Sequence, residues 1–326
     1  MSPSSAFVSR SSALAGLFVA LLAAVPLVAD DFQLSILALI FLFAYVGQAW
    51  NLMMGLAGQL SLGHALYFGV GGYTVAVLAG RYEVTPWLGM PVAFVLCAAL
   101  GTVVGALGFR FAVRGVYFAL LTIAFAELGR VLFEHWDFVG KTAGFFLPAL
   151  GPDNVPLVTL RGGARFFYYA LLVSLAACWI LAALLARSRV GYYWRAIRED
   201  EDAARAIGVP AFRMKCLAVA ISAGLTGIGG AWFGLMGGSL FPETMLGMRM
   251  SIEIIIAPIV GGLGTMFGPV LGAFVVVPLN ELSKDLAQHF NVSGLNFLIY
   301  GLLLGAVVLF APHGLWPRLS AWLRLK

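Results

Sequence analysis

Ten apolar segments, each 15 to 23 residues long, make up most of this chain of 326 residues. An α-helix needs about 20 mostly apolar residues to cross the roughly 30 Å hydrocarbon core of a bilayer. We therefore predict ten spans, two of which are short, adjoin glycine-rich stretches and are expected to be half-helices or tilted. The predicted spans are 12–29, 32–54, 64–80, 88–109, 115–134, 166–186, 214–236, 248–262, 267–284 and 294–312.

The composition excludes several classes of protein. Hydrophobic residues make up 61% of the chain and charged residues 11%, whereas soluble domains have about 45–50% and about 25%. So few charges cannot cover a soluble surface, which excludes a soluble enzyme and a nucleic-acid-binding domain. The net charge of +5 fits a membrane protein, in which excess Lys and Arg mark the cytoplasmic loops.

Basic residues cluster on one side of the predicted spans. With the N-terminus inside, 13 of the 20 Lys and Arg residues fall on the inner side, seven of them between residues 187 and 215. The positive-inside rule therefore predicts that both termini are cytoplasmic, and an even number of spans agrees. The longest connections are then an extracytoplasmic loop at about 135–165 and a cytoplasmic loop at about 187–213.

Segment 12–29 has two interpretations. It follows Arg10 and several serines, as a cleaved signal peptide does. We expect it to be a first spanning helix instead, because nine further apolar segments follow. Residues 1–326 are then one transmembrane domain, and the expected fold is an all-α polytopic membrane protein of about ten helices, some of them short or broken.

Two glycine-rich stretches, 55–63 (GLAGQLSLG) and 261–268 (GGLGTMFG), interrupt hydrophobic runs in the two halves of the chain. Paired interruptions of this kind are typical of inverted repeats around a central pathway. Two ordinary loops would give the same spacing. Glycines also recur every four residues, as at Gly101 and Gly105 and at Gly230 and Gly234, which predicts close packing of helices in lipid.

The cytoplasmic loop contains a predicted amphipathic helix at 195–208. Ile197, Ala204 and Ile207 recur at helical spacing, four acidic residues stand early in the segment, and Gly208 followed by Pro210 ends it. Such a helix can dock in a groove of a soluble partner. A solvated connector helix is the alternative interpretation.

Five sequence motifs resemble those of known proteins. DAARAIG at 202–208 is similar to the coupling-loop motif of bacterial ABC import permeases, with Asp202 in place of Glu. The four further motifs are AGQLSLGHA at 57–65, RGVYFALLT at 114–122, RAIRED at 195–200 and GGLGTMFGP at 261–269. They resemble, along nearly the whole chain and in the same order, the branched-chain amino acid permeases of the LivM type, which belong to ABC importers.

The resemblance implies a permease subunit in a bacterial inner membrane, crossing the lipid bilayer many times. Its expected partners are a second, LivH-type permease, two cytoplasmic ATPase subunits that bind the ATP, and an extracytoplasmic substrate-binding protein. The helix at 195–208 would transmit closure of the ATPases to the spans. The residues expected to act in this coupling are Arg195, Ile197, Arg198, Glu199, Asp200, Asp202, Ala203, Ala204, Ile207 and Gly208.

The chain departs from the family pattern in two places. The Ile-x-Leu-Pro sequence expected after Gly208 is absent, and an acidic or amide position in the outer loop is replaced by Phe145 and Phe146. The second departure leaves several solutes open: a branched-chain amino acid, another amino acid, or an aromatic or short-chain acid. A purely structural loop that packs both aromatic rings on the bundle is equally consistent.

Polar side chains at membrane depth are the candidates for a solute pathway, because they are costly unless they face protein or water. Interhelical hydrogen bonding, or a position near the lipid headgroups, is the alternative for each of them, and it is the interpretation we favour for Glu253 and Glu281. The candidates for the pathway are Gln48, Asn51, Gln59, Ser61, His64 and Glu127.

No catalytic, metal or nucleotide site is expected in the chain itself. A phosphate-binding loop requires a glycine five residues before GKT at 140–142, where His135 stands. The four histidines have no ligand partner at metal-binding spacing. The chain is therefore expected to be a permease that is not an enzyme and has no cofactor of its own.

Two other functions remain open. The first is an ion-coupled secondary transporter of small organic acids, in which Glu127 would titrate with the proton. The second is a membrane scaffold that transports nothing.

Overall fold

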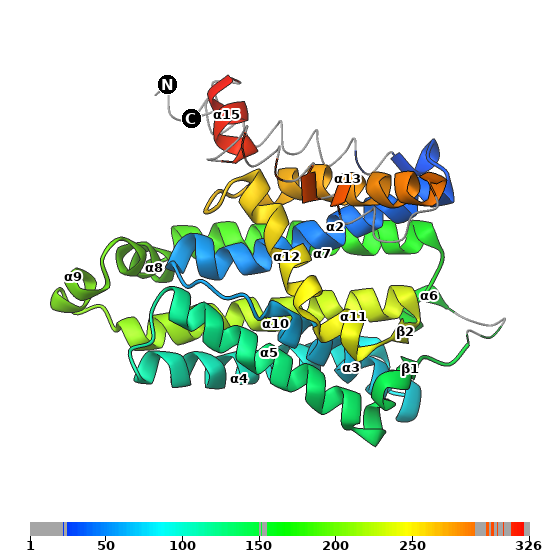
Figure 1. Cartoon of the computed structure of the whole chain (residues 1–326), viewed down its shortest axis with the longest axis horizontal. Coiled ribbons are helices and arrows are strands. Elements are labelled where there is room, and N and C mark those ends of the chain that lie inside the picture. The colour runs from blue at the N-terminus through cyan, green and yellow to red at the C-terminus, as the bar shows by residue number, and fades with distance from the viewer. Residues whose placement is uncertain are drawn as a thin grey trace.

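The computed structural model describes residues 22, 25–149, 151, 155–290, 298–299, 301–302, 305, 309 and 314–322, with backbone only for 287–290. Most of the long helices lie side by side along one direction, and α12 (Met248–Gly261) crosses them at an angle (Figure 1). The long helices are α2 (Asp31–Asn51), α3 (His64–Arg81), α4 (Pro86–Arg110), α5 (Val116–His135), α7 (Ala164–Arg187), α10 (Ala211–Gly237), α12 (Met248–Gly261) and α13 (Gly268–Phe290).

Shorter elements connect them. They are η1 (Val25–Leu27), η2 (Leu52–Leu56), η3 (Asp137–Val139), η4 (Lys141–Ala143), β1 (Phe145–Phe146), α6 (Pro156–Thr159), α8 (Arg189–Glu199), α9 (Glu201–Ala206), β2 (Ser239–Leu240), α11 (Pro242–Leu246) and α15 (Leu315–Trp322). The two strands pair antiparallel, so the described part of the chain is all-α apart from a sheet of two residues per strand.

Six helical segments of the described residues are long and apolar enough to cross a membrane. They are Asp31–Leu56, Pro86–Arg110, Val116–His135, Ala164–Arg187, Ala211–Gly237 and Pro242–Gly261. The spans predicted at 64–80 and 267–284 are also helices, α3 and α13. The spans predicted at 12–29 and 294–312 lie largely outside the described residues, and Val25–Leu27 forms a 3₁₀ turn. An all-α multi-pass membrane fold is confirmed, while the number ten and the sides of the termini stay predictions.

Local sequence signals fix where several helices begin. Asp30 caps α2, because its side chain accepts a hydrogen bond from the Gln33 backbone N–H at 2.8 Å while the Gln33 side chain accepts one from the Asp30 N–H. Thr85 caps α4 in front of Pro86, which suits the first turn because proline lacks an N–H. These caps satisfy backbone groups that the helix itself leaves free.

The two ends of the helix bundle carry different connecting elements. Elements α8 and α9 lie at one end, whereas β1, β2 and α6 lie at the opposite end (Figure 1). The two long connections of the chain are therefore on opposite sides of the bundle. We refer to these as the α9 end and the β end.

Helix α10 packs against α3 and α4 through glycines. A Cβ atom added at Gly230 would lie 1.7 Å from the Phe68 carbonyl oxygen, and one at Gly227 would lie 2.6 Å from Cys97 Sγ. Gly101 on α4 faces Ala223 with a similar lack of space. The predicted close packing at Gly101 and Gly230 is therefore confirmed.

Replacing Gly230 by alanine should strongly reduce the amount of folded protein, because the clash is with backbone and cannot be relieved by a side-chain rotation. Gly237, on the same helix, is the matched control, since a Cβ there meets nothing within 4 Å. We expect Gly237→Ala to behave like the unaltered protein in fluorescence-detected size exclusion. Equal yields of monodisperse protein for the two variants would contradict this packing.

Candidate functional site

The loop at the α9 end is two helices rather than the single helix predicted at 195–208. Helix α8 ends at Glu199, and the Asp200 side chain accepts hydrogen bonds from the backbone N–H groups of Asp202 and Ala203, both at 2.9 Å, which starts α9. Aspartate is a favoured N-cap because its side chain satisfies free N–H groups. The acidic run therefore marks a helix boundary, and not the first turn of a longer helix.

The predicted apolar face is only partly formed. Ile197 and Ala204 are buried in a small cluster with Val209 and Ala211, whereas Ile207 is 79% exposed. The apolar contacts of the loop are thus made within the chain. The exposed residues of α9 and its end are the surface that remains for a partner: Asp202, Ala203, Arg205, Ala206, Ile207 and Gly208.

Glu201 holds α9 onto the bundle. Its Oε1 atom accepts a hydrogen bond from Lys215 Nζ on α10 at 2.8 Å and also pairs with Arg205, and its Oε2 atom lies 3.7 Å from Arg114 Nε. The Lys215 side chain is 3% exposed and that of Glu201 is 11% exposed. Glu201 is therefore a partly desolvated link between α9, α10 and the α4–α5 turn.

Asp202 adds a second tether to the same turn, with Arg114 Nη2 donating to its Oδ1 at 3.3 Å. The Arg114 guanidinium holds the pKa of the Asp202 carboxyl below its ordinary value, and Asp202 and Glu201 raise the pKa of Arg114. A depressed carboxyl pKa contributes stability that is present above the unfolded pKa and lost as pH falls through the lower folded pKa. This tether is therefore intact at neutral pH and in mildly acidic solution.

Arg198 connects α8 to both glycine-rich stretches. Its guanidinium donates a hydrogen bond to the Gly55 carbonyl oxygen, 143 residues away in sequence. Its side chain also packs on Gly58, where an added Cβ would lie 3.1 Å from Arg198 Cγ, and on Gly264, where an added Cβ would lie 2.9 Å from Arg198 Nη1. Both glycines have positive φ (+69° and +74°), so glycine suits the backbone as well as the space.

The two glycine-rich stretches also contact each other. Asn51 Nδ2 donates to the Thr265 carbonyl at 2.9 Å, and the Gly264 N–H donates to Asn51 Oδ1 at 2.8 Å. A Cβ at Gly55 would lie 2.7 Å from Gly264 Cα. The interruptions predicted from sequence therefore meet at one place, next to Arg198. Whether they belong to an inverted repeat stays a prediction.

Residues 57–63 turn back into the bundle. Helix α2 ends in the π-helical turn η2. Helix α3 begins at His64, and its side-chain Nε2 lies 2.9 Å from Ser222 Oγ, near the middle of α10. The chain thus returns from the α9 end to the interior without helical structure. Non-helical backbone at membrane depth requires hydrogen-bond partners supplied by the protein.

Side chains supply those partners. The Leu62 N–H donates to Thr122 Oγ1 at 3.1 Å, the Ala65 N–H donates to Ser251 Oγ at 3.0 Å, and Trp50 Nε1 donates to the Ser61 carbonyl at 2.9 Å. Ser61 Oγ and His64 Nδ1 lie 3.0 Å apart and are buried. Ser61 and His64 therefore stabilise the non-helical segment 57–63. A role for them in a solute pathway stays a prediction.

Removing the Ser251 hydroxyl should destabilise this non-helical segment. In Ser251→Ala the buried Ala65 N–H loses its acceptor, and an unsatisfied buried group costs about 1–3 kcal/mol. Ser174→Ala is the control, because that hydroxyl donates only to the Ala170 carbonyl of its own helix. Thermal unfolding in detergent should show a lower midpoint for Ser251→Ala alone, and equal midpoints would contradict the assignment.

The other predicted pathway residues do not form one site with these. Gln48 is buried and its Oε1 atom has no hydrogen-bond partner among the described residues, and Gln59 donates to the carbonyl of Ala57, two residues away. Glu127 faces outward from α5, with its side chain 49% exposed, and is paired with Arg130. A carboxylate held by an arginine is poorly suited to cycle a proton, so the structure gives no support to the secondary-transporter alternative.

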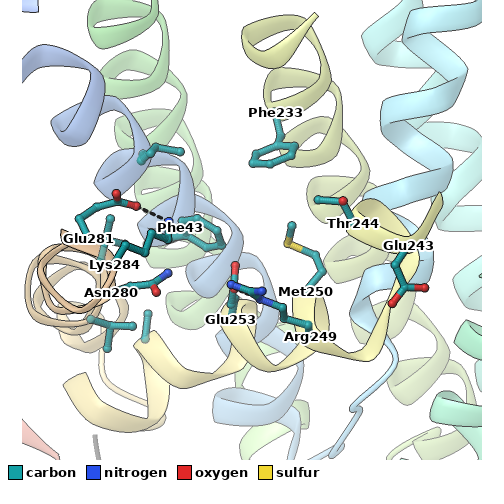
Figure 2. A pocket seen from close by; sticks show the side chains of 14 residues that line it. Phe43, Phe233, Glu243, Thr244, Arg249, Met250, Glu253, Asn280, Glu281 and Lys284 are labelled. Carbon is teal, nitrogen blue, oxygen red and sulfur yellow. Dashed lines mark hydrogen bonds and ion pairs between the residues drawn. The ribbon is translucent and has the colours of Figure 1, made fainter. Parts of the chain in front are cut away.

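A cavity of about 510 Å³ lies among α2, α10, α11, α12 and α13 (Figure 2). The pairs Arg249–Glu253 on α12 and Glu281–Lys284 on α13 line it, with nitrogen–oxygen distances of 2.9 and 2.6 Å. Glu253 and Glu281, interpreted from sequence as interhelical or headgroup residues, are thus brought together. The remaining lining residues are Leu39, Phe43, Phe233, Glu243, Thr244, Met250, Ala257, Val276, Val277 and Asn280.

A second cavity, of about 590 Å³, is lined almost entirely by apolar residues, among them Tyr45, Trp87, Leu157 and Trp232. An apolar lining favours hydrocarbon and provides nothing to pair with a charged solute. The cavity between α12 and α13 is therefore the one whose chemistry suits a charged solute.

The loop at the β end packs one of its two aromatic residues. Phe145 is buried and Phe146 is 63% exposed, and the strand that holds them pairs with Ser239–Leu240 after α10. The alternative in which both rings pack on the bundle holds fully for Phe145 alone of the two, because Phe146 stays largely exposed although its ring contacts that of Phe241, with centroids 5.8 Å apart. Strand β1 lies at the end of the bundle opposite α9 (Figure 1).

A family model described as "Branched-chain amino acid transport system / permease component" matches residues 32–312. The chain belongs to this permease family. The match includes α8, α9, both glycine-rich stretches and the cavity between α12 and α13. The resemblance seen in the motifs is therefore confirmed.

The permease is similar to curated relatives of two types. It is 28% identical to the high-affinity branched-chain amino acid transport system permease protein LivM of Escherichia coli (strain K12), over 92% of this chain and 74% of the relative. It is 24% identical to LivH of the same strain, over 85% and 91%. A probable LivH permease protein of Methanocaldococcus jannaschii is 24% identical over 77% and 82%. No solved structure matches significantly.

Three residues of this permease that sequence reasoning did not single out hold the α9 end together: Glu201, Arg114 and Lys215. Glu201 stands within the acidic run but was not separated from its neighbours, and two of its partners, Lys215 and Arg114, are at least 14 residues away in sequence. Sequence reasoning also did not single out Arg249 and Lys284, which line the cavity between α12 and α13. The available signal was their spacing, since each lies three or four residues from Glu253 or Glu281 on the same helix.

Proposed function

We propose that this permease is one subunit of an importer for amino acids, branched-chain amino acids in particular, driven by ATP that separate subunits hydrolyse. The observation that carries the proposal is the contact of Arg198 with both glycine-rich stretches. Through this contact, a displacement of α8 and α9 is transmitted to the two glycine-rich stretches, where the helices are interrupted. A rigid-body shift at one end of the bundle can thereby alter its interior.

The α9 end is the side proposed to face the cytoplasm and the ATPases. Ile207 and its exposed neighbours on α9 offer an apolar and charged surface to such a partner, while Glu201 and Asp202 fix that surface to α10 and to the α4–α5 turn. The coupling residues predicted at 195–208 belong to this unit as α8 and α9. The second permease and the extracytoplasmic binding protein complete the proposed assembly, with the binding protein at the β end.

The proposal is tested by uptake of radiolabelled L-leucine into proteoliposomes. The vesicles contain the permease, the second permease and the ATPases, with ATP inside and the binding protein outside. We expect uptake only when the ATPases and ATP are both present. Uptake driven by a proton gradient without ATPases would overturn the proposal in favour of a secondary transporter.

A further inference from the structure

Two basic and three acidic side chains line the cavity between α12 and α13, and one of the acidic ones, Glu243, lies on α11. Arg249 and Glu253 lie on α12, and Glu281 and Lys284 lie on the neighbouring α13. Their side chains are 57%, 20%, 33% and 40% exposed, so the charges remain accessible to a ligand. Charges within membrane spans are costly and are functional candidates by default.

The same cavity has an apolar wall. Figure 2 shows Asn280, Glu281 and Lys284 on one side, Phe233 and Met250 on the other, and Phe43 between them. The Asn280 amide makes no hydrogen bond with the other described residues and lines the cavity. The volume of about 510 Å³ lies within the usual range for small-molecule sites, about 300–1,000 Å³.

Charged residues continue from the cavity along the surface. Glu243 lines the cavity and also pairs with Arg130 of α5 at 3.0 Å, and Arg130 pairs in addition with Glu127 and Glu134. This band of charge at the depth of the spans would be unfavourable against lipid chains. The cavity is therefore expected to open to water and to receive a dissolved solute.

We propose that this cavity is a binding site of the permease itself for a zwitterion with an apolar side chain, that is, a free aliphatic amino acid. Arg249 and Lys284 donate to its carboxylate, Glu253 and Glu281 accept from its ammonium group, and Phe43 and Met250 contact its side chain. The site lies within one subunit and is distinct from any site on a separate binding protein. The inference rests on the proposed function and deepens it by naming what this subunit recognises.

The test measures the rate at which an impermeant maleimide labels a cysteine placed in the cavity. Asn280→Cys and Thr244→Cys, on opposite walls, are made separately in a Cys216→Ser background, since the other cysteines, Cys97 and Cys178, are buried. The complete complex is used in nanodiscs of phosphatidylglycerol. We expect saturating L-leucine to slow labelling at one or both positions at least about fivefold, and to leave labelling of Val155→Cys at the β end unchanged.

Two analogues test the zwitterion. Isocaproate keeps the carboxylate and isopentylamine keeps the ammonium group, and each should slow labelling less than about twofold at the same concentration. Glu281→Gln and Glu253→Gln should each abolish most of the protection by L-leucine, whereas Glu83→Gln, an exposed residue outside the cavity, should keep it. Equal protection by either analogue, or full protection in both glutamine variants, would overturn the proposal.

A lipid headgroup with an ammonium and a phosphate is the other source of a zwitterion. If phosphatidylethanolamine in the nanodisc slows labelling and L-leucine adds nothing, the site belongs to lipid and the proposal is wrong. Absence of protection at both cysteines would also overturn it. ATP-driven uptake by the Cys216→Ser complex is measured in parallel, so that normal uptake without protection counts against this site alone and absent uptake counts against the proposed function.

Discussion

Replacing Arg198 by alanine should abolish ATP-driven uptake of L-leucine, to below about a tenth of the rate of the unaltered complex, while the permease still folds. The Arg198 side chain is the contact between α8 and the Gly55 carbonyl, and it packs on Gly58 and Gly264. Without it, movement of α8 no longer reaches the glycine-rich stretches. ATP hydrolysis by the assembled complex should continue, since the nucleotide sites are on other subunits, so hydrolysis and uptake become uncoupled.

The matched control is Arg189→Ala, at the exposed start of the same helix. It removes an equal charge from α8 without removing a contact to the glycine-rich stretches. We expect its uptake to be within about twofold of the unaltered complex. Uptake lost equally in both variants would show that only the positive charge of α8 matters, and would contradict a mechanical role for Arg198.

The second large effect is expected from Glu201→Gln, which leaves the buried Lys215 ammonium without its carboxylate. Removing one partner of a buried ion pair costs about 3–5 kcal/mol, and we expect about 2–3 kcal/mol here because Glu201 keeps some contact with water. Lys215 Nζ also lies 4.4 Å from the centre of the Phe109 ring, so its surroundings favour the cation only weakly once the carboxylate is gone. Thermal unfolding should show a midpoint lower by about 5 °C or more.

Glu199→Gln is the control for this variant, because Glu199 is exposed and forms no ion pair with the other described residues. Its unfolding midpoint should not change measurably. The double variant Glu201→Gln with Lys215→Met removes both buried charges and should recover much of the lost stability. A double variant as unstable as the sum of the two single changes would contradict the pairing.

The sequence predicts the spans well because hydropathy reports a physical requirement of the bilayer, and α2, α4, α5, α7 and α10 begin and end close to their predicted limits. The sequence predicts poorly that the helix at the α9 end is interrupted between α8 and α9. Ile197, Ala204 and Ile207 fit one helical period only if the helix is continuous, and the Asp200 cap interrupts it. Ile197 and Ala204 still share one buried cluster across the break, whereas Ile207 follows the last residue of α9 and is exposed.

The candidate sites depend on contacts that no local pattern encodes. Arg198 reaches Gly55, which is 143 residues away, and Asn51 reaches Gly264 and Thr265. The cavity likewise forms only when α12 and α13 lie side by side. The sequence identified the costly polar groups at membrane depth, but which of them share a site is decided by the packing of the helices.

The most direct test of the account is protection of α9 by the ATPases. The introduced thiol of Ile207→Cys, made with Cys216→Ser, should react quickly with an impermeant maleimide when the permeases alone are in nanodiscs, since Ile207 is 79% exposed and the remaining Cys97 and Cys178 are buried. Adding the ATPase subunits should slow that reaction at least about tenfold and leave Val155→Cys at the β end unaffected. Unchanged labelling at Ile207, or protection at Val155 instead, would contradict the claim that the ATPases act on the bundle through α8 and α9.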